Sequence, residues 1–131
     1  MNLNRFLSIP YGEGGSDWNS CDCYGLVELW YLERFGIELR ERGEIMSSPA
    51  GLQEGFDKAT DWVSVRVPQN DDLIVMRGMH GKTALLSGHI GIYWNGSVIH
   101  TQPLHGCVMQ PIEGRQIKPR ITSIQRHAIF A

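Results

Sequence analysis

The sequence predicts an α+β domain in which N-terminal helices pack on an antiparallel, half-rolled sheet. Three observations carry this prediction. Apolar residues recur at helical spacing from Gly25 to Phe35. Beyond Trp62 the apolar runs are short, and Asn95-Gly96 separates two of them, which is the strongest short-range signal for a hairpin. The helical and strand patterns occupy separate blocks of the chain, as in α+β proteins.

The helical block follows a loop. Residues 10–20 are rich in Gly, Ser and Asn, which favour turns. The helix predicted over 25–35 ends at Gly36, because the left-handed residue that closes a helix is most often glycine. Ser48-Pro49 then supplies an N-cap with proline in the first turn, so we expect a second helix that extends to about Lys58.

Short strands account for most of the remaining chain. Residues 77–88 contain three glycines and are expected to form a mobile loop. The expected strands are Trp62–Val67 (ending at Pro68), Leu73–Met76, His89–Trp94, Ser97–Thr101, a short strand near Val108, and a last one from Ile121 to Ile129.

Size and charge exclude several classes of function. A chain of 131 residues can bury one core, so we expect a single domain over 1–131. The net charge of −2 provides no basic surface for nucleic acid. No apolar run is long enough to insert into a membrane, and the first residues lack the apolar stretch of a secretory signal, so we expect folding in a cytoplasm. Three cysteines, an odd number, argue against a disulfide framework.

A thiol stands where the first predicted helix begins. Cys23 precedes Gly25 by two residues, so its sulfur would face the unsatisfied backbone N–H groups of the first turn. Such a position, like a neighbouring imidazolium, lowers the pKa of a thiol, and the same N–H groups can hold an oxyanion. Gly25 has no side chain and would let another segment approach closely. We interpret Cys23 as a candidate nucleophile, against the alternative of a small apolar helix residue.

Two histidines of the predicted hairpin are candidates for the base. If Trp94 pairs with Ser97 around the two-residue turn, Gly91 lies opposite His100 and leaves room for its imidazole. His89 and His100 then share one face as diagonal neighbours, so that one ring can orient the other. A cysteine at a helix N-terminus together with such a pair is the arrangement of a cysteine hydrolase.

Zinc binding is the competing chemistry for the same region. The Cys-x-Cys spacing differs from the usual Cys-x-x-Cys, and the last cysteine has no close partner in the sequence, so we favour a site without metal. The residues that could be grouped around zinc are Cys21, Cys23, His89, His100 and Cys107. The other histidines are interpreted as loop or surface residues: His80, His105 and His127.

These segments together resemble the NlpC/P60 family of cysteine peptidases. The resemblance covers most of residues 10–102. The matching segments are Asp22-Cys23-Tyr24-Gly25-Leu26-Val27, His89-Ile90-Gly91-Ile92-Tyr93, Val98-Ile99-His100, Asp72-Leu73-Ile74-Val75 with Asp71 in place of a glycine, and Pro10-Tyr11 ahead of Gly14-Gly15.

The resemblance implies a papain-like fold and a cysteine endopeptidase of the Cys-His-His type that uses no cofactor. Cys23 would be the nucleophile, His89 the base, and His100 the residue that orients the base. Tyr11 matches a position that helps to build the oxyanion site. The implied substrate is the peptide stem of peptidoglycan, cut between D-γ-glutamyl and a diamino acid.

Two motif residues have open interpretations. Asp22 is either a carboxylate that stabilises the helix N-terminus or a ligand for the amine of the substrate. Tyr24 stands where the family usually has serine, and it is either a packing residue or part of the substrate site. With an aromatic residue there, the motif is similar to the variant found in tail proteins of long-tailed bacteriophages and related gene-transfer particles.

This similarity leads to an expectation about location. We expect a protein made in the host cytoplasm, joined to other tail-tip proteins in the virion, and acting at the bacterial cell wall. The apolar residues from Ile121 to Phe130 are candidates for docking to the tail, although we favour the interpretation that they complete the sheet. Two alternatives stay open: a structural tail-tip or hub component that keeps the fold, and a hydrolase of another amide or thioester.

Overall fold

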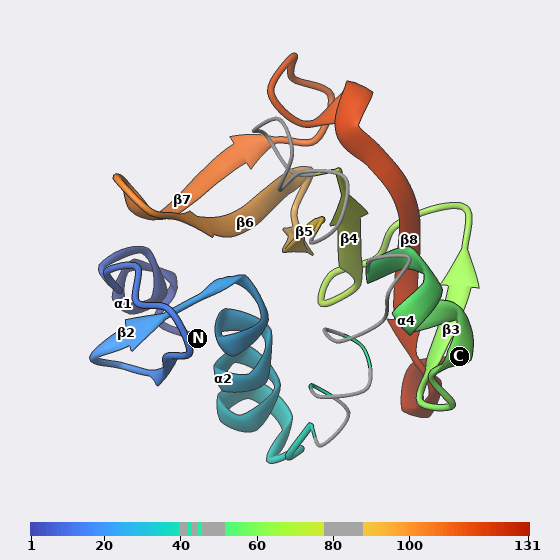
Figure 1. Cartoon of the computed structure of the whole chain (residues 1–131), viewed down its shortest axis with the longest axis horizontal. Helices are drawn as coiled ribbons and strands as arrows, with labels where there is room; N and C mark the ends of the chain where they lie inside the picture. The colour runs from blue at the N-terminus through green and yellow to red at the C-terminus, as the bar shows by residue number, and fades with distance from the viewer. Residues whose placement is uncertain (40–41, 43–44, 46–51, 78–87) are drawn as a thin grey trace.

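The computed structural model describes residues 1–39, 42, 45, 52–77 and 88–131. Short helices lie beside a six-stranded antiparallel sheet that curves around the longest helix, α2 (Figure 1). This architecture confirms the predicted α+β class. Among the described residues the helices are α1 (Leu3–Leu7), α2 (Cys23–Phe35), α4 (Leu52–Lys58) and the 3₁₀ turns η1 (Lys118–Arg120) and η2 (Ala128–Phe130).

The main sheet has the strand order β3-β8-β4-β5-β6-β7. Strands β4 to β7 follow one another as a meander, and β8 inserts between β3 and β4. A separate two-stranded ribbon precedes α2. The strands are β1 (Ser16–Asp17), β2 (Ser20–Cys21), β3 (Trp62–Val65), β4 (Leu73–Met76), β5 (His89–Trp94), β6 (Ser97–Gln102), β7 (Gly106–Pro111) and β8 (Ile121–His127).

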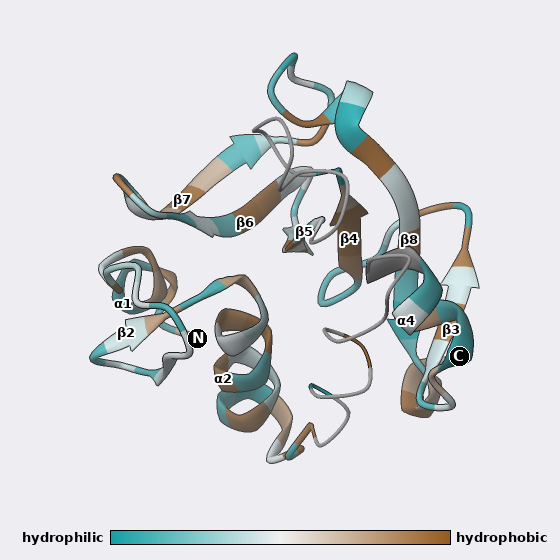
Figure 2. Cartoon of the chain, in the orientation of Figure 1, coloured by the Kyte–Doolittle hydropathy of each residue, from teal (hydrophilic) through white to brown (hydrophobic). Residues whose placement is uncertain are grey.

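Side chains that alternate along the strands cover both faces of the sheet. Ile90 and Ile92 belong to the main core, which includes the apolar side of α2. Ile74, Met76 and Val98 belong to a second apolar cluster on the opposite face. All four residues of β4 are buried, and Figure 2 shows this strand as hydrophobic along its length. A strand covered on both faces loses the apolar-polar alternation that a half-exposed strand shows.

Helix α2 begins and ends as its sequence predicts. Asp22 is the N-cap, and its side chain accepts a hydrogen bond from the backbone N–H of Gly25 at 2.7 Å. Gly36 adopts the left-handed conformation (φ 67°), and its N–H donates to the carbonyl of Leu32. The helix therefore starts two residues earlier than the apolar spacing indicates, which puts Cys23 at its first position.

The hairpin register is the one predicted. Trp94 pairs with Ser97, and Ile92 pairs with Ile99. Asn95 and Gly96 both have positive φ (47° and 86°), as a two-residue type I′ turn requires. This register fixes which residues of β5 and β6 share a face.

Several boundaries differ from the prediction. The segment 10–20 contains the short ribbon of β1 and β2 as well as loop, and α1 precedes it. Strand β3 ends at Val65, two residues early. Strand β8 ends at His127, and its pairing with β3 and β4 confirms that this part of the chain completes the sheet. The expected helix start at Ser48-Pro49 and most of the loop 77–88 lie outside the described residues.

No helix within the described ranges has the length and apolar character needed to cross a membrane.

Candidate active site

The Cys23 thiol lies where α2 approaches the start of β5. The residue is half-buried and occupies the first position of the helix. Backbone hydrogen bonds from Ile90 and Tyr24 reach its sulfur. Gly25 allows the loop before β1 to pack closely on the start of α2, because a Cβ on it would lie 1.7 Å from the carbonyl oxygen of Gly15. The expected close approach of another segment at Gly25 is therefore confirmed.

The Cys23 sulfur lies on the side of β5 that faces β6. The register of these two strands pairs Trp94 with Ser97 and Ile92 with Ile99. The N–H of Tyr93 donates to the carbonyl of Asp72, which leads into β4, so by alternation the N–H of Ile90 faces the β6 side. This N–H donates to the sulfur of Cys23, which therefore lies on that side of the strand.

A chain of hydrogen bonds crosses β5, β6 and β7. Nε2 of His89 lies 2.8 Å from Nδ1 of His100, and Nε2 of His100 lies 2.6 Å from Oε1 of Gln110. The three residues come from β5, β6 and β7 respectively. We call His89, His100 and Gln110 the relay. The expected pairing of the two imidazoles is thus observed, and their rings meet edge to face with centroids 5.0 Å apart.

Gly91 provides the space that the relay needs. A Cβ at this position would lie 2.4 Å from Cγ1 of Val98 and 3.1 Å from Cβ of His100. A side chain here would clash with Val98 and press against the Cβ of His100. The predicted role of Gly91 opposite His100 is confirmed.

Burial sets the protonation of Cys23 and His89. Desolvation, with a smaller contribution from Asp22, raises the pKa of the Cys23 thiol to about 11, despite hydrogen bonds to the sulfur that favour the thiolate. Desolvation, together with His100 and the Arg120 guanidinium, lowers the pKa of His89 to about 3. The expectation that the start of the helix lowers the pKa of the Cys23 thiol is therefore wrong. The pair rests as a neutral thiol and a neutral imidazole.

Tyr11 lies within electrostatic reach of the Cys23 sulfur. It forms an isolated bridge with Cys21 at the ribbon before α2. Burial and then the Cys23 sulfur raise the pKa of its phenol, so the hydroxyl stays protonated and can donate a hydrogen bond. This position is compatible with a role toward an oxyanion.

The Asp22 carboxylate already has three donors. Besides capping Gly25, it accepts from the backbone N–H of Gly14 at 2.9 Å and from the guanidinium of Arg42. Arg42 also donates to Glu28 at 2.8 Å. Of the two interpretations of Asp22, the structure supports the helix cap directly.

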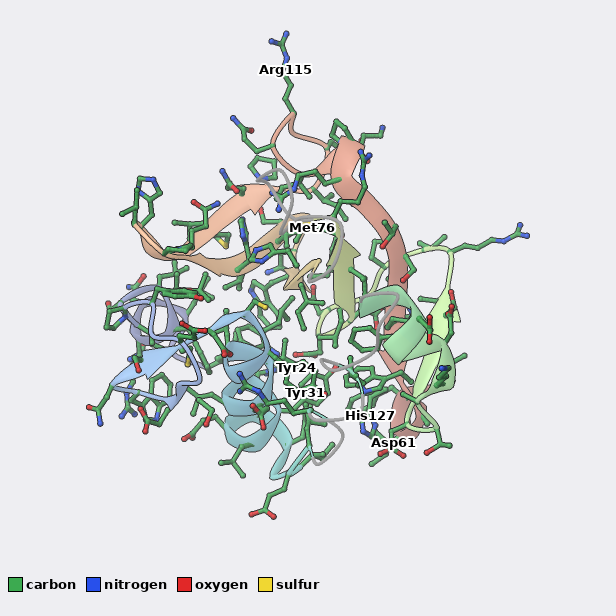
Figure 3. All side chains as sticks on the ribbon, in the orientation of Figure 1. Tyr24, Tyr31, Asp61, Met76, Arg115 and His127 are labelled. Carbon is green, nitrogen blue, oxygen red and sulfur yellow. The ribbon has the colours of Figure 1, made fainter. Side chains whose placement is uncertain are left out.

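Tyr24 is buried in the core. None of its surface is exposed, and the Arg42 guanidinium lies 5.8 Å above its ring. Figure 3 shows the residue in the interior of the molecule. A ring without exposed surface fits the packing interpretation of Tyr24.

The other candidate ligands are dispersed. Cys21 and Cys107 are buried, and no group of three metal-ligating side chains occurs within the described ranges. His105 is exposed in the turn before β7, whereas His80 lies outside the described residues. His127 is partly buried, and its ring contacts the rings of Tyr31 and Trp62.

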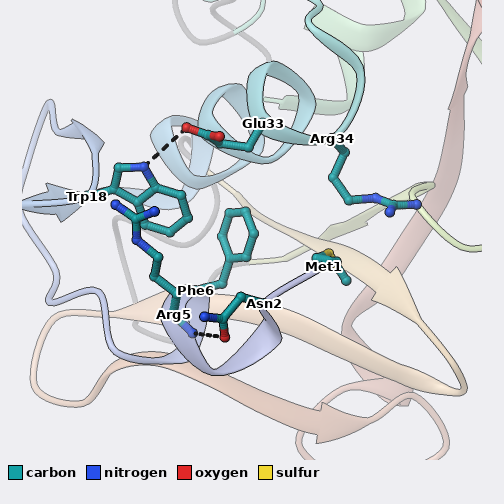
Figure 4. Close-up of a pocket in the computed structure, with 7 residues that line it drawn as sticks. All are labelled: Met1, Asn2, Arg5, Phe6, Trp18, Glu33 and Arg34. Atoms are coloured by element: carbon teal, nitrogen blue, oxygen red, sulfur yellow. Dashed lines mark hydrogen bonds between the residues drawn. The ribbon is translucent and has the colours of Figure 1, made fainter.

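A separate hollow lies at the far end of α2. It has a volume of about 330 Å³, and Figure 4 shows its lining. The Arg5 guanidinium stacks 3.8 Å from the Trp18 ring, whose Nε1 donates to Glu33 at 3.1 Å. Glu33 is ten residues from Cys23 along the helix, a separation of roughly 15 Å. This hollow is therefore distinct from the thiol site.

Sequence reasoning missed two residues that act on the histidines. Gln110 is the end of the relay, and Arg120 is a nearby cation that opposes protonation of both imidazoles. Gln110 could have been found by continuing the strand register from β6 to β7. In that register Val98 pairs with Gln110 and His100 pairs with Val108. Arg120 carries no such signal, since it lies in a 3₁₀ turn outside the strands that carry the histidines.

Comparison with known families gives a match over nearly the whole chain. The NlpC/P60 family matches residues 8–126. A search of curated proteins finds no match.

Solved structures of NlpC/P60 domains have the same fold. The NlpC/P60 domain of the peptidoglycan hydrolase SagA is 19% identical with a TM-score of 0.60, over 94% of this chain and 91% of that one. A family protein from Bacillus cereus is 23% identical with a TM-score of 0.65, and NlpC1 from Trichomonas vaginalis is 20% identical with a TM-score of 0.66. The alignments cover 94% and 95% of this chain but 37% and 41% of the two proteins, so the chain spans less than half their length.

Proposed function

The chain belongs to the NlpC/P60 family, and we propose that it is a cysteine peptidase that cuts an amide bond in the peptide stem of peptidoglycan. The scissile bond that the motif resemblance favours joins D-γ-glutamyl to a diamino acid. The proposal rests on one observation above the others. A thiol at a helix N-terminus accepts a hydrogen bond from β5, the strand that carries one of two hydrogen-bonded histidines.

The proposed reaction begins with a neutral thiol. His89 takes the proton from Cys23 as the sulfur attacks the carbonyl carbon, so the S–H bond breaks while a C–S bond forms. Charge develops on the carbonyl oxygen, where the phenol of Tyr11 and the backbone N–H of Cys23 would stabilise it. His89 then gives the proton to the leaving amine. Water hydrolyses the resulting thioester, with the imidazole again acting as base.

Purified peptidoglycan provides the direct test. The full chain is incubated with it, and the released fragments are identified by mass spectrometry. We expect fragments with a new amine on the diamino acid. The Cys23→Ala and His89→Ala variants should release none. Release of sugar fragments alone, or equal release by Cys23→Ala, would contradict the proposal.

We propose further that the protein acts in a phage-type tail during entry, together with other tail-tip proteins. The support is the sequence Asp22-Cys23-Tyr24-Gly25-Leu26-Val27, with its aromatic residue after the cysteine. Purified tail particles from cells that express the chain would be probed for it. Its absence from particles, together with wall-degrading activity of the free protein, would contradict this location.

A structural role for the same fold is the second candidate function. The observation that favours it is the high pKa of the Cys23 thiol, which leaves little thiolate at neutral pH. A structural component would assemble normally as Cys23→Ala and lose no infectivity. A hydrolase acting on another amide or on a thioester would be inert on peptidoglycan yet would still require Cys23.

A further inference from the structure

Gln110 ends the relay at a position that the strand register defines. His100 on β6 pairs with Val108 on β7, and Val98 pairs with Gln110. Side chains two residues apart on a strand share a face, so Gln110 is the diagonal neighbour of His100. The 2.6 Å bond between Oε1 of Gln110 and Nε2 of His100 is the shortest link of the relay.

The directions of the two hydrogen bonds follow from what each group can donate. An amide oxygen only accepts, so Nε2 of His100 carries a proton. A neutral imidazole has one N–H and one lone pair, so Nδ1 of His100 accepts, and the donor at 2.8 Å is the Nε2–H of His89. The lone pair of His89 is then on Nδ1, the one nitrogen that the relay does not use.

We propose that Gln110 is a positioning residue whose side-chain oxygen fixes the proton of each relay histidine on Nε2 and thereby keeps Nδ1 of His89 free to accept the Cys23 proton. The direction of proton movement rests on the proposed function. In the step itself, the S–H bond of Cys23 breaks and an N–H bond forms on Nδ1. The proton on Nε2 of His89 stays in place, held by His100.

A neutral amide suits this position because the relay already faces a cation. Arg120 is the charged group that acts on both imidazoles among the described residues, and it opposes their protonation. A carboxylate in place of Gln110 would pull the relay toward imidazolium. The amide oxygen orients the protons without supplying a charge.

The tautomers can be observed without any substrate. Long-range proton-nitrogen NMR spectra of the uniformly ¹⁵N-labelled full chain distinguish Nδ1–H from Nε2–H for each histidine. We expect Nε2–H for both His89 and His100 in the wild type. In Gln110→Leu the buried N–H of His100 loses its acceptor, and we expect the Nδ1–H form of His89 to increase at least fivefold. A wild-type His89 protonated on Nδ1, or unchanged tautomers in Gln110→Leu, would overturn the proposal.

Alkylation of Cys23 tests the consequence for reactivity. The rate with iodoacetamide is measured from pH 5 to 9, with modification located by peptide mass spectrometry. Gln110→Leu should slow alkylation at pH 7 by roughly fivefold to tenfold, the worth of one hydrogen bond. Gln110→Glu keeps an acceptor oxygen, so it should restore the rate to within about twofold and move the acidic limb to higher pH.

A second buried glutamine provides the matched control. Gln125 is 2% exposed, donates to Ser123, and pairs with Leu73, which places it on the α2 side of the sheet, opposite the relay. Gln125→Leu should lower stability yet leave the tautomers and the pH profile unchanged. An equal effect of both leucine variants would assign Gln110 a purely structural role. If the wild-type protein has the expected tautomers but does not cleave peptidoglycan, the proposed function is contradicted and the role of Gln110 is upheld.

Discussion

Two buried polar networks on this sheet differ in how their charges are balanced. The relay crosses β5, β6 and β7 and consists of neutral groups, with a lowered pKa at both imidazoles. The second network lies at the start of β4 and consists of ion pairs. We call it the aspartate corner, and its members are Asp71, Asp72, Arg34 and Arg126.

Each aspartate of the corner joins β4 to another element. Asp71 accepts hydrogen bonds from Nε1 of Trp30 and Nε of Arg34, both on α2 and both at 2.8 Å. Asp72 accepts from Nε and Nη2 of Arg126 on β8, at 3.0 and 2.8 Å. The corner therefore ties α2, which begins at Cys23, and the last strand to the centre of the sheet.

The comparison separates two uses of buried polarity. In the corner each carboxylate faces a guanidinium, so removing one partner leaves a charge without compensation. The relay is neutral at rest. Protonating one of its imidazoles places a single charge in a buried site. We infer that the corner holds the architecture and the relay performs the chemistry.

Loss of the nucleophile should give the largest effect on activity and almost none on stability. Cys23→Ala removes the attacking sulfur, and we expect release of peptide fragments to fall by at least about 10³-fold. The free energy of unfolding should change by less than about 1 kcal/mol, because the residue is small and half-buried. A large loss of stability, measured by urea unfolding, would break the distinction between the two networks.

Breaking the aspartate corner should lower stability strongly and change the reactivity of Cys23 little. Asp72→Ala leaves the Arg126 guanidinium without its carboxylate, and this arginine side chain is only 14% exposed. We expect a loss of about 3 kcal/mol in the free energy of unfolding. The alkylation rate of Cys23 per folded molecule should stay within about twofold of wild type. A tenfold slower rate in fully folded protein would show that the corner takes part in the chemistry.

Substitutions of Asp71 distinguish the energetic cost of backbone strain from the cost of losing the ion pair. Its φ is +79°, in the left-handed region where glycine is least strained, and the resembling family motif has glycine here. Asp71→Gly should cost about 2 kcal/mol through the lost ion pair, partly offset by relief of the backbone. Asp71→Ala loses the same contacts without that relief, so it should be about 1 kcal/mol less stable than Asp71→Gly. Equal stabilities would show that the left-handed conformation is not strained.

The sequence predicted the parts of this fold that depend on local periodicity and turn chemistry. Helix α2, its end at Gly36, and the hairpin around Asn95-Gly96 depend on contacts within a few residues, and each is observed. The diagonal pairing of His89 with His100 followed from counting outward from that turn. Strand order was not predictable in this way, because β8 reaches its place between β3 and β4 from the end of the chain.

The electrostatic state of the site could not be predicted from the motif. A thiol at a helix N-terminus is expected to ionise easily, but the desolvation of Cys23 outweighs the hydrogen bonds to its sulfur. Desolvation depends on what the whole fold packs around a group. The same holds for Arg120, which is distant in sequence from the histidines it influences.

The three thiols should label at different rates. Burial raises the pKa of Cys21 and Cys107 to about 12, compared with about 11 for Cys23. One pKa unit is a tenfold difference in thiolate, and Cys21 and Cys107 are also 0% and 6% exposed whereas Cys23 is half-buried. We expect Cys23 to label at least ten times faster with iodoacetamide in native protein, and His89→Ala to slow it. Equal rates would mean that Cys23 is as inert as the structural thiols.

Acid should weaken the fold through the relay. His89 has a pKa of about 3 in the folded chain, compared with 6.5 as its ordinary value. Between these two values the unfolded chain binds a proton that the folded chain does not, so stability is complete above pH 6.5 and decreases as the pH falls. His89 is partly exposed, so we expect a loss of about 1 kcal/mol between pH 6.5 and 4.5 from this residue. His89→Gln removes the contribution of His89 to this acid-dependent loss. His100 and His127, whose pKa values are also lowered, still contribute. Urea midpoints measured across this range should therefore decline less steeply in the variant, and identical slopes would place the acid sensitivity outside His89.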